Sequence, residues 1–216
     1  MMISFFKYIL SNYSLLTLCT ISLALLQVRF AYTGDDKFIF LVWNLFLAII
    51  PYLIGKWLRF RESENPYIIS SLLLIWLLFL PNAIYLITDF IHLKISDLII
   101  TTLDFLILGS FSCAGTFMAF ESMKDSYIML NKHLFNISKN KYYCIITFLS
   151  AMGVYLGRVL RWNSWDILRD PSGLVMDSIH LFIHPLREIN AWIFIGAFFT
   201  FTLISLRLYN HFFYEK

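Results

Sequence analysis

The sequence predicts an all-α membrane protein, a bundle of about six spanning helices with a short interfacial helix, and three observations lead to this fold class. Of the 216 residues, 59% are hydrophobic and only 14% are charged, whereas soluble globular proteins carry about 25% charged residues. The mean hydropathy is +0.71, and a soluble fold of this size would leave large aggregating apolar patches. Apolar runs long enough to cross a bilayer recur along the chain.

Six runs approach the roughly 20 apolar residues that a spanning helix needs. They are Ile9–Val28, Phe38–Trp57, Ile68–Ile87, Leu98–Phe120, Tyr143–Leu160 and Ile189–Leu208. Helices are expected because backbone groups in lipid must pair within the segment, and the runs lack the polar alternation of barrel strands. The first run is longer than the apolar part of a signal peptide and no small-residue cleavage site follows it, so we expect an uncleaved anchor.

Two connections between the runs are long. Glu121–Lys141 carries four lysines. In Arg161–Glu188, a turn at Asp170-Pro171-Ser172-Gly173 precedes Leu174–Pro185, which we expect to form a short interfacial helix. The chain has no repeat or low-complexity stretch, so we expect one transmembrane domain over residues 1–216.

The distribution of basic residues predicts the orientation. With the N-terminus inside, the cytoplasmic connections hold more Lys and Arg than the outer ones, so we expect both termini in the cytoplasm. The net charge of +3 does not indicate a nucleic-acid partner, because the basic residues lie in short connections rather than on one soluble face. The expected partner is the lipid bilayer, and the sequence does not indicate an oligomeric state.

Polar residues in the apolar runs gather near the predicted outer face. Asn82, Tyr85, Asp89 and His92 are spaced three, four and three apart, which places them on one stripe of a helix. Asp104 lies about two turns into the fourth run. The remaining polar residues near this face are Asn44, at the start of the second run, and Arg158, Arg161, Asn163 and Asp166, around the end of the fifth.

A charge in hydrocarbon costs several kcal/mol, so such side chains usually face the bundle interior and pair with one another. Asp89 and Asp104 need cations, and Arg158 and Arg161 are the nearest candidates, because arginine can hold a carboxylate bidentately. Two interpretations stay open. The charges either lock the helices together without chemistry, or they line an outward-facing pocket that binds an anionic lipid or cell-envelope precursor.

The pocket hypothesis assigns roles to individual residues. Arg158 and Arg161 would hold the phosphate or carboxylate, while Asp89 with His92 would form an acid–base pair or bind a divalent ion. The candidate catalytic residues are Asp89, His92 and Asp104, and the candidate ligand-binding residues are Asn44, Asn82, Tyr85, Arg158, Arg161, Asn163 and Asp166.

Metal and cofactor signatures are weak. His180 and His184 are four residues apart, with Glu188 on the same face, a spacing that can ligate zinc. The pair lacks the glutamate of an H-E-x-x-H helix and Pro185 interrupts it, so we expect a polar rim and no metal site. The sequence contains no Gly-rich phosphate loop, nucleophile elbow or nucleotide fingerprint, and the cofactor stays unknown.

Several motifs together resemble the bacterial membrane family called domain of unknown function 1361. They are Trp43-Asn44-Leu45-Phe46-Leu47-Ala48 with Pro51, Leu80-Pro81-Asn82-Ala83 through Thr88-Asp89 to His92-Leu93, Asp104, Gly157-Arg158 and Arg161-Trp162-Asn163-Ser164-Trp165-Asp166. The resemblance extends from the second run to the last and does not include His180 and His184. It implies a multi-pass protein of the bacterial inner membrane and supplies no activity.

Three function classes therefore stay open: binding or modification of an anionic lipid or envelope precursor, a small transporter or ion and proton relay, and a non-catalytic membrane subunit or assembly factor. The lack of internal repeats argues mildly against a self-contained carrier. Whether the protein is an enzyme is left open.

Overall fold

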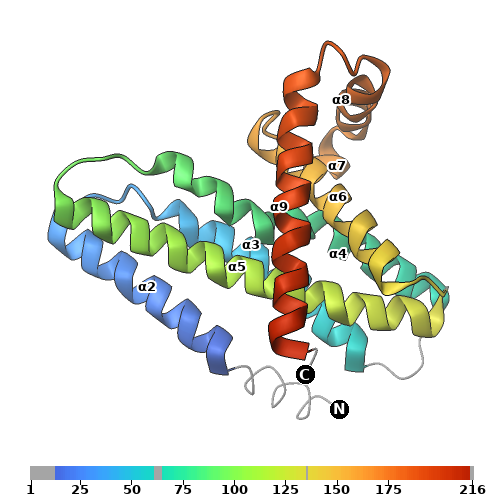
Figure 1. Ribbon diagram of the computed structural model, residues 1–216, viewed down its shortest axis with the longest axis horizontal. Coiled ribbons are helices and arrows are strands. Elements are labelled where there is room, and N and C mark those ends of the chain that lie inside the picture. Colours follow the sequence, from blue (N-terminus) through green and yellow to red (C-terminus); the bar gives the residue numbers. More distant parts are fainter. Residues whose placement is uncertain (1–12, 61–64, 135, 215–216) are drawn as a thin grey trace. The chain divides into compact units, whose positions relative to one another are not determined.

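The computed structural model describes residues 13–60, 65–134 and 136–214, and the regular secondary structure in these ranges is entirely helical. The elements are α2 (Tyr13–Thr33), α3 (Phe40–Phe60), α4 (Pro66–Tyr85), η1 (Leu86–His92), α5 (Leu98–His133), α6 (Lys139–Arg158), α7 (Asp166–Arg169), α8 (Pro171–Ile183) and α9 (Ile189–Tyr214) (Figure 1). The predicted all-α class is confirmed. The chain divides into two compact units, residues 1–136 and 137–216.

Five stretches of the described chain are long and apolar enough to cross a membrane, namely α2, α3, α4 with η1, α5 and α9. They coincide with five of the six expected runs, although residues 9–12 of the first run lie outside the described residues. The other run, Tyr143–Leu160, falls on α6, which length and composition do not mark as a span. Lys139 and Lys141 begin α6 and Arg158 ends it, which lowers its hydropathy.

The first unit is built around α3 and α5. α3 packs against α4 and α5, while α2 and η1 also contact α5. Close packing at one crossing depends on Gly115, because a Cβ there would collide with the backbone oxygen of Ala83 and with Leu86. One turn away, the hydroxyl of Ser112 donates to the backbone oxygen of Leu86 at 2.8 Å. Small residues on this face of α5 therefore allow it to pack closely against α4 and η1.

α5 is longer than the sequence predicts. It has 36 residues, or about 54 Å of helix, against about 30 Å of hydrocarbon. The expected run ends at Phe120, yet the helix continues through Glu121 and Asp125, both buried. Glu121 and Asp125 end the apolar run but do not end the helix, because their carboxylates pair with Lys56 and Arg59 of α3.

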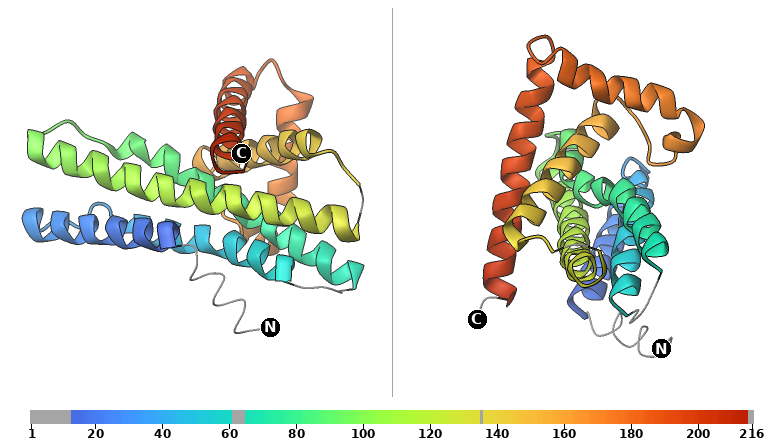
Figure 2. Two further views of the ribbon diagram at one scale, coloured as in Figure 1. Left: turned by 60° about the horizontal axis from the view of Figure 1, so that its bottom comes forward. Right: turned by 90° about the vertical axis from the view of Figure 1, so that its right-hand side faces the viewer.

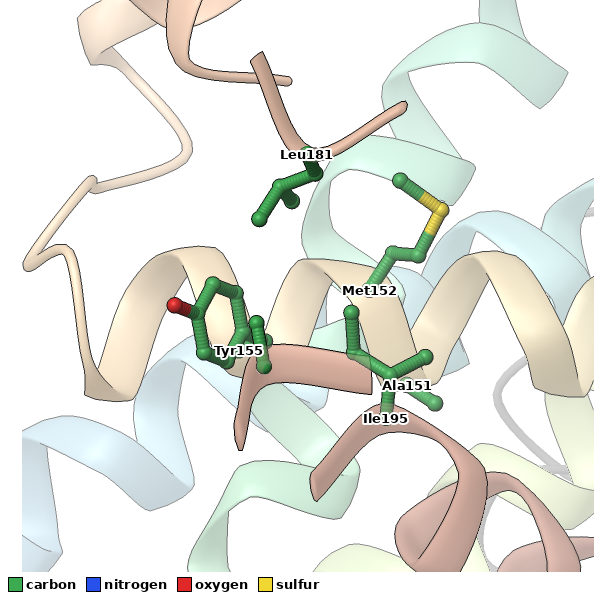
Figure 3. Packing of buried hydrophobic residues seen from close by; sticks show 6 residues of the cluster. Ala151, Met152, Tyr155, Leu181 and Ile195 are labelled. Atoms are coloured by element: carbon green, nitrogen blue, oxygen red, sulfur yellow. The ribbon is translucent and has the colours of Figure 1, made fainter. Parts of the chain in front are cut away.

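The second unit pairs α6 with α9. Its core consists of Ala151, Met152 and Tyr155 of α6, Leu181 of α8, and Ala191 and Ile195 of α9 (Figure 3). Leu181 is the one residue of α8 that is buried, and it fixes α8 across the end of the α6–α9 pair. Figure 2 shows α8 running crosswise to α9.

Candidate functional site

Asp104 of α5 is the centre of a buried ion cluster in the first unit. It is 1% exposed, and Arg29 of α2 is 3% exposed. The Nε of Arg29 donates to Oδ1 of Asp104 at 2.6 Å, and the Nζ of Lys37 donates to Oδ2 at 3.2 Å. Both carboxylate oxygens of Asp104 are therefore occupied by cations that the sequence interpretation had counted as loop charges.

The same two cations are held from a second side. The guanidinium of Arg29 lies 4.8 Å from the ring centre of Phe38, and the ammonium of Lys37 lies 4.5 Å from it. Arg29 also donates to the backbone oxygen of Asp35 at 2.9 Å. A desolvated cation over an aromatic face gains up to about 2 kcal/mol, so this cluster ties α2 and the following connection to α5.

Asp89 lies fully buried at a change of helical winding. α4 ends at Tyr85, and Leu86–His92 continues as a 3₁₀ helix. A 3₁₀ helix has about three residues per turn, so Asp89 aligns with Leu86 rather than with Tyr85. The single α-helical stripe predicted from Asn82 to His92 is wrong for this reason.

The residues around Asp89 have different environments. Asn44 of α3 donates from Nδ2 to Oδ2 of Asp89 at 3.1 Å, which brings two predicted residues together. Asn82 donates from Nδ2 to the backbone oxygen of Phe79 at 3.1 Å. His92 is exposed, and its ring packs edge-on against Phe40 with 5.2 Å between the centroids. Within the described residues, the His92 nitrogens make no hydrogen bond to Asp89.

A second ion network joins α3 and α5 at the opposite end of α5, about 25 Å from Asp104 along the helix axis. The Nζ of Lys56 lies 2.7 Å from Oε2 of Glu121 and 2.8 Å from Oδ2 of Asp125. Arg59 contacts the other oxygen of Asp125 at 2.8 Å.

Sequence reasoning missed this network because its residues lie at the ends of the apolar runs or just beyond them, and they were counted as loop charges. The available signal was spacing: Glu121 and Asp125 are four apart, and Lys56 and Arg59 are three apart. Each pair therefore lies on one helical face.

The other predicted residues belong to the second unit. Arg158 is half-buried at the end of α6 and interacts with its surroundings. Arg161 is exposed and holds a left-handed backbone with φ of 63°, a conformation that costs about 1–2 kcal/mol in residues other than glycine. Asp166 accepts hydrogen bonds on Oδ2 from the backbone nitrogen of Asn163 at 2.7 Å and from its Nδ2 at 3.0 Å.

Trp162, directly before Asn163, is fixed to α8. Nε1 of Trp162 donates to Oδ2 of Asp177 at 2.8 Å, and a Cβ on Gly173 would collide with Asp170 and crowd the Trp162 ring. Asp170 accepts from the backbone nitrogen of Gly173 at 2.9 Å and from the Ser172 hydroxyl at 3.0 Å. These hydrogen bonds lower the pKa of the Asp170 carboxyl below its ordinary value.

His180 of α8 and His184, which directly follows the helix, lie beside Glu188 and each other. Nδ1 of His180 lies 3.6 Å from Oε1 of Glu188, and the His180 and His184 rings pack edge-on at 4.8 Å. The described residues contain no group of three or more His, Cys, Asp or Glu side chains placed to hold a metal ion.

Residues 43–205 match the model of the family described as "Protein of unknown function (DUF1361)". The chain belongs to this family. The resemblance carried by the sequence motifs is thus confirmed, and with five apolar spanning stretches this DUF1361 protein is a multi-pass integral membrane protein. No curated protein and no solved structure matches the chain.

The matched region of this DUF1361 protein includes the whole α3–α5 ion network and the segment from Arg158 to Asp166. Arg29 and Lys37, which hold Asp104, precede it. The catalytic and ligand-binding assignments of individual residues stay predictions.

Proposed function

We propose that the protein binds an anionic lipid or an anionic cell-envelope precursor at the outer side of the bacterial cytoplasmic membrane. The observation that carries this proposal is the environment of Arg161. Its guanidinium makes no hydrogen bond or ion pair to the described residues, and its backbone is held in a left-handed conformation. Strained, exposed residues of this kind are often functional, and an unpaired arginine suits bidentate binding of phosphate or carboxylate.

The orientation follows from the basic residues. We propose that α6, which has 20 residues, crosses the membrane as a sixth span. An N-terminus in the cytoplasm then puts Arg161 outside and leaves Lys124, Lys132, Lys139 and Lys141 inside, in agreement with the preference of Lys and Arg for cytoplasmic connections.

Within the first unit, the candidate catalytic residues Asp89, His92 and Asp104 have different surroundings. His92 is exposed and packs against the ring of Phe40. Asp104 has one oxygen occupied by the buried Arg29 and the other by the half-buried Lys37, which suits it to holding helices together.

Native mass spectrometry of the purified protein tests the proposal. The chain should release with a bound anionic molecule, and Arg161→Ala should lose that molecule while the yield of folded protein stays normal. Arg207→Ala is the matched control. Arg207 lies in the C-terminal half of α9, and it is also exposed and unpaired within the described residues. Retention of the ligand by Arg161→Ala would overturn the proposal.

A second candidate function is an ion or proton relay in the first unit. It is favoured by the buried carboxylates of Asp89, Asp104, Glu121 and Asp125, since ionisable groups in membrane helices often mark ion pathways. Proton uptake by proteoliposomes, abolished by Asp89→Asn, would support this candidate over lipid binding.

A non-catalytic subunit or assembly factor is the third candidate. It is favoured by the two ion clusters, because their carboxylates are already paired with cations of the same chain. Each buried carboxylate of these clusters already contacts at least one cation within 3.2 Å. On this hypothesis Asp104→Asn lowers the abundance of the protein and alters no measurable transport or binding.

A further inference from the structure

The connection from η1 to α5 exposes large apolar side chains. Ile91 is 74% exposed, Ile95 is 92% exposed and Leu98 is 80% exposed. The connection lies at the end of α5 that holds Asp104 (Figure 1). Apolar side chains that gather on a surface in this way mark contact with a membrane or with another molecule.

Hydrogen bonds within the connection give it a fixed shape. The backbone nitrogen of Ser96 donates to the hydroxyl of Thr101 at 3.0 Å. The carboxylate of Asp97 accepts from the backbone nitrogen of Ile99 at 3.0 Å and caps the first turn of α5. An ordered backbone therefore presents the apolar side chains, and the described residues leave them uncovered.

The two ion networks of α5 indicate where the hydrocarbon of the bilayer lies. Asp104 and Glu121 are about 25 Å apart along the helix axis, close to the roughly 30 Å of bilayer hydrocarbon. Residues 105–120 between them contain no charged side chain, and neither do residues 38–55, which lead from one network to the other along α3. Each network therefore lies near one border of the hydrocarbon, because charged side chains are costly within it.

Aromatic side chains support these two borders. Tyr32 of α2 and Trp43 of α3 are exposed at the end that holds Asp104. Trp57 and Tyr67 lie at the other end, where α3 finishes and α4 begins. Tyrosine and tryptophan concentrate at membrane–water interfaces, because their rings are partly apolar and partly polar.

The height of the connection follows from this placement. Leu98 precedes Asp104 by six residues, or about 9 Å of helix. When the two networks are centred in about 30 Å of hydrocarbon, Leu98 lies about 6 Å beyond its border, within a head-group layer of about 5–8 Å on each side. A helix tilt of about 20° changes this height by about 1 Å.

We infer that Ile91, Ile95 and Leu98 insert into the nearer leaflet of the bilayer, so that the connection from η1 to α5 anchors this end of the first unit in the membrane interface. The occupant of this apolar surface is lipid, because the surface lies at the head-group level and continues from two spanning helices. Lys94, between these side chains, has a long apolar stem that lets its ammonium group stay in water.

The anchor gives His92 a defined position. His92 is exposed between Ile91 and Lys94, so the anchor places its ring at the level of the lipid head groups. The anchor requires no ligand at Arg161. The inference therefore goes beyond the proposed function and fails or stands separately from it.

Fluorescence quenching in lipid nanodiscs tests the depth of the connection. In a variant whose Cys19, Cys113 and Cys144 are changed to Ala, a fluorophore is attached at Ile95→Cys or, as the control at nearly the same height, at Lys94→Cys. The nanodiscs contain phosphatidylcholine and phosphatidylglycerol. Brominated lipid should quench the Ile95→Cys label, and aqueous iodide should quench the Lys94→Cys label.

Two results would overturn the inference. Equal quenching of both labels by iodide would place Ile95 in water. Shielding of the Ile95→Cys label from both quenchers would mean that a second copy of the chain or another protein covers the connection.

A charged variant tests whether apolar insertion holds the connection in place. With Ile91→Asp and Ile95→Asp combined, a label at Leu98→Cys should lose its quenching by brominated lipid and become accessible to iodide. Lys94→Gln is the control and should leave the Leu98→Cys label quenched by lipid. Circular dichroism should show the native helix content in each variant. A label that stays quenched by lipid in the doubly charged variant would show that insertion does not set its depth and would overturn the inference.

Discussion

The ammonium group of Lys56 lies 2.8 Å from a carboxylate oxygen of Asp125, and neither side chain has any exposed surface. Glu121 contacts the same ammonium group from the preceding turn of α5. A charge buried this deeply depends on its partners, because removal of one member leaves the others without compensation in a medium of low dielectric constant.

The first prediction follows from this network. Lys56→Met should lower the free energy of unfolding by about 3–5 kcal/mol, because it strands Glu121 and Asp125. Changing Glu121 to Gln in the same chain should restore part of that loss. Thermal unfolding in a single detergent, followed by circular dichroism, measures both effects.

Lys124 provides the control for this prediction. It lies 4.0 Å from Glu121 at the edge of the same network and is partly exposed. Lys124→Met should cost less than about 1 kcal/mol, as exposed ion pairs do. If the two lysine variants lose equal stability, burial is not the source of the effect.

Composition and apolar runs were sufficient to predict the helices, because lipid imposes length and internal hydrogen bonding on every span. They could not predict that α6 falls short of a membrane span by length and composition, that the chain winds as a 3₁₀ helix from Leu86, or that α5 continues past Phe120. These depend on packing between helices, which no single run encodes.

The candidate site was predicted in part. Sequence spacing identified Asp104 as a buried charge but proposed its partners from the end of the fifth run. The structure provides Arg29 and Lys37 instead, and Arg29 is the residue directly after the expected end of the first run. Which cations pair with a buried carboxylate depends on which helices pack side by side. The hydropathy of the sequence does not contain this information.

The second prediction concerns the crossing of α5 with α4. Gly115→Ala should destabilise the protein by about 1–3 kcal/mol, as overpacking does, because the new Cβ meets the Ala83 backbone oxygen, which cannot move independently of α4. Gly196→Ala in α9 is the control, since no atom lies within 4 Å of a Cβ there. That variant should gain about 0.5–1 kcal/mol from helix propensity. Destabilisation of both variants alike would contradict the packing argument.

The third prediction is a pH dependence at the start of α8. Hydrogen bonds from Gly173 and Ser172 lower the pKa of the Asp170 carboxyl. A depressed pKa in the folded state means that the stabilisation is complete above the ordinary carboxyl pKa and is lost as pH falls through the lowered value. Amide exchange in the first turn of α8 should therefore accelerate on acidification beyond the intrinsic rate change. Asp170→Asn should remove this pH dependence, and a persistent dependence in that variant would assign it to another group.

The fourth prediction fixes the orientation. In a variant whose Cys19, Cys113 and Cys144 are changed to Ala, new cysteines at Asp36, Lys94 and Ser172 should react with an impermeant thiol reagent added to intact cells. A cysteine at Asn136 should react only after the membrane is opened, because the Lys-rich connection around it belongs in the cytoplasm. The opposite pattern would place Arg161 inside the cell and would remove the outer-leaflet ligand from the proposal.

The fifth prediction separates the backbone of Arg161 from its charge. The left-handed conformation at φ of 63° costs a residue with a Cβ about 1–2 kcal/mol, and glycine avoids that cost while adding some entropy to the unfolded chain. Arg161→Gly should therefore be up to about 1 kcal/mol more stable than Arg161→Ala. Both variants lack the guanidinium, so both should lose the bound anionic molecule in native mass spectra. A glycine variant that keeps its ligand would show that the loop conformation, rather than the arginine charge, forms the binding site.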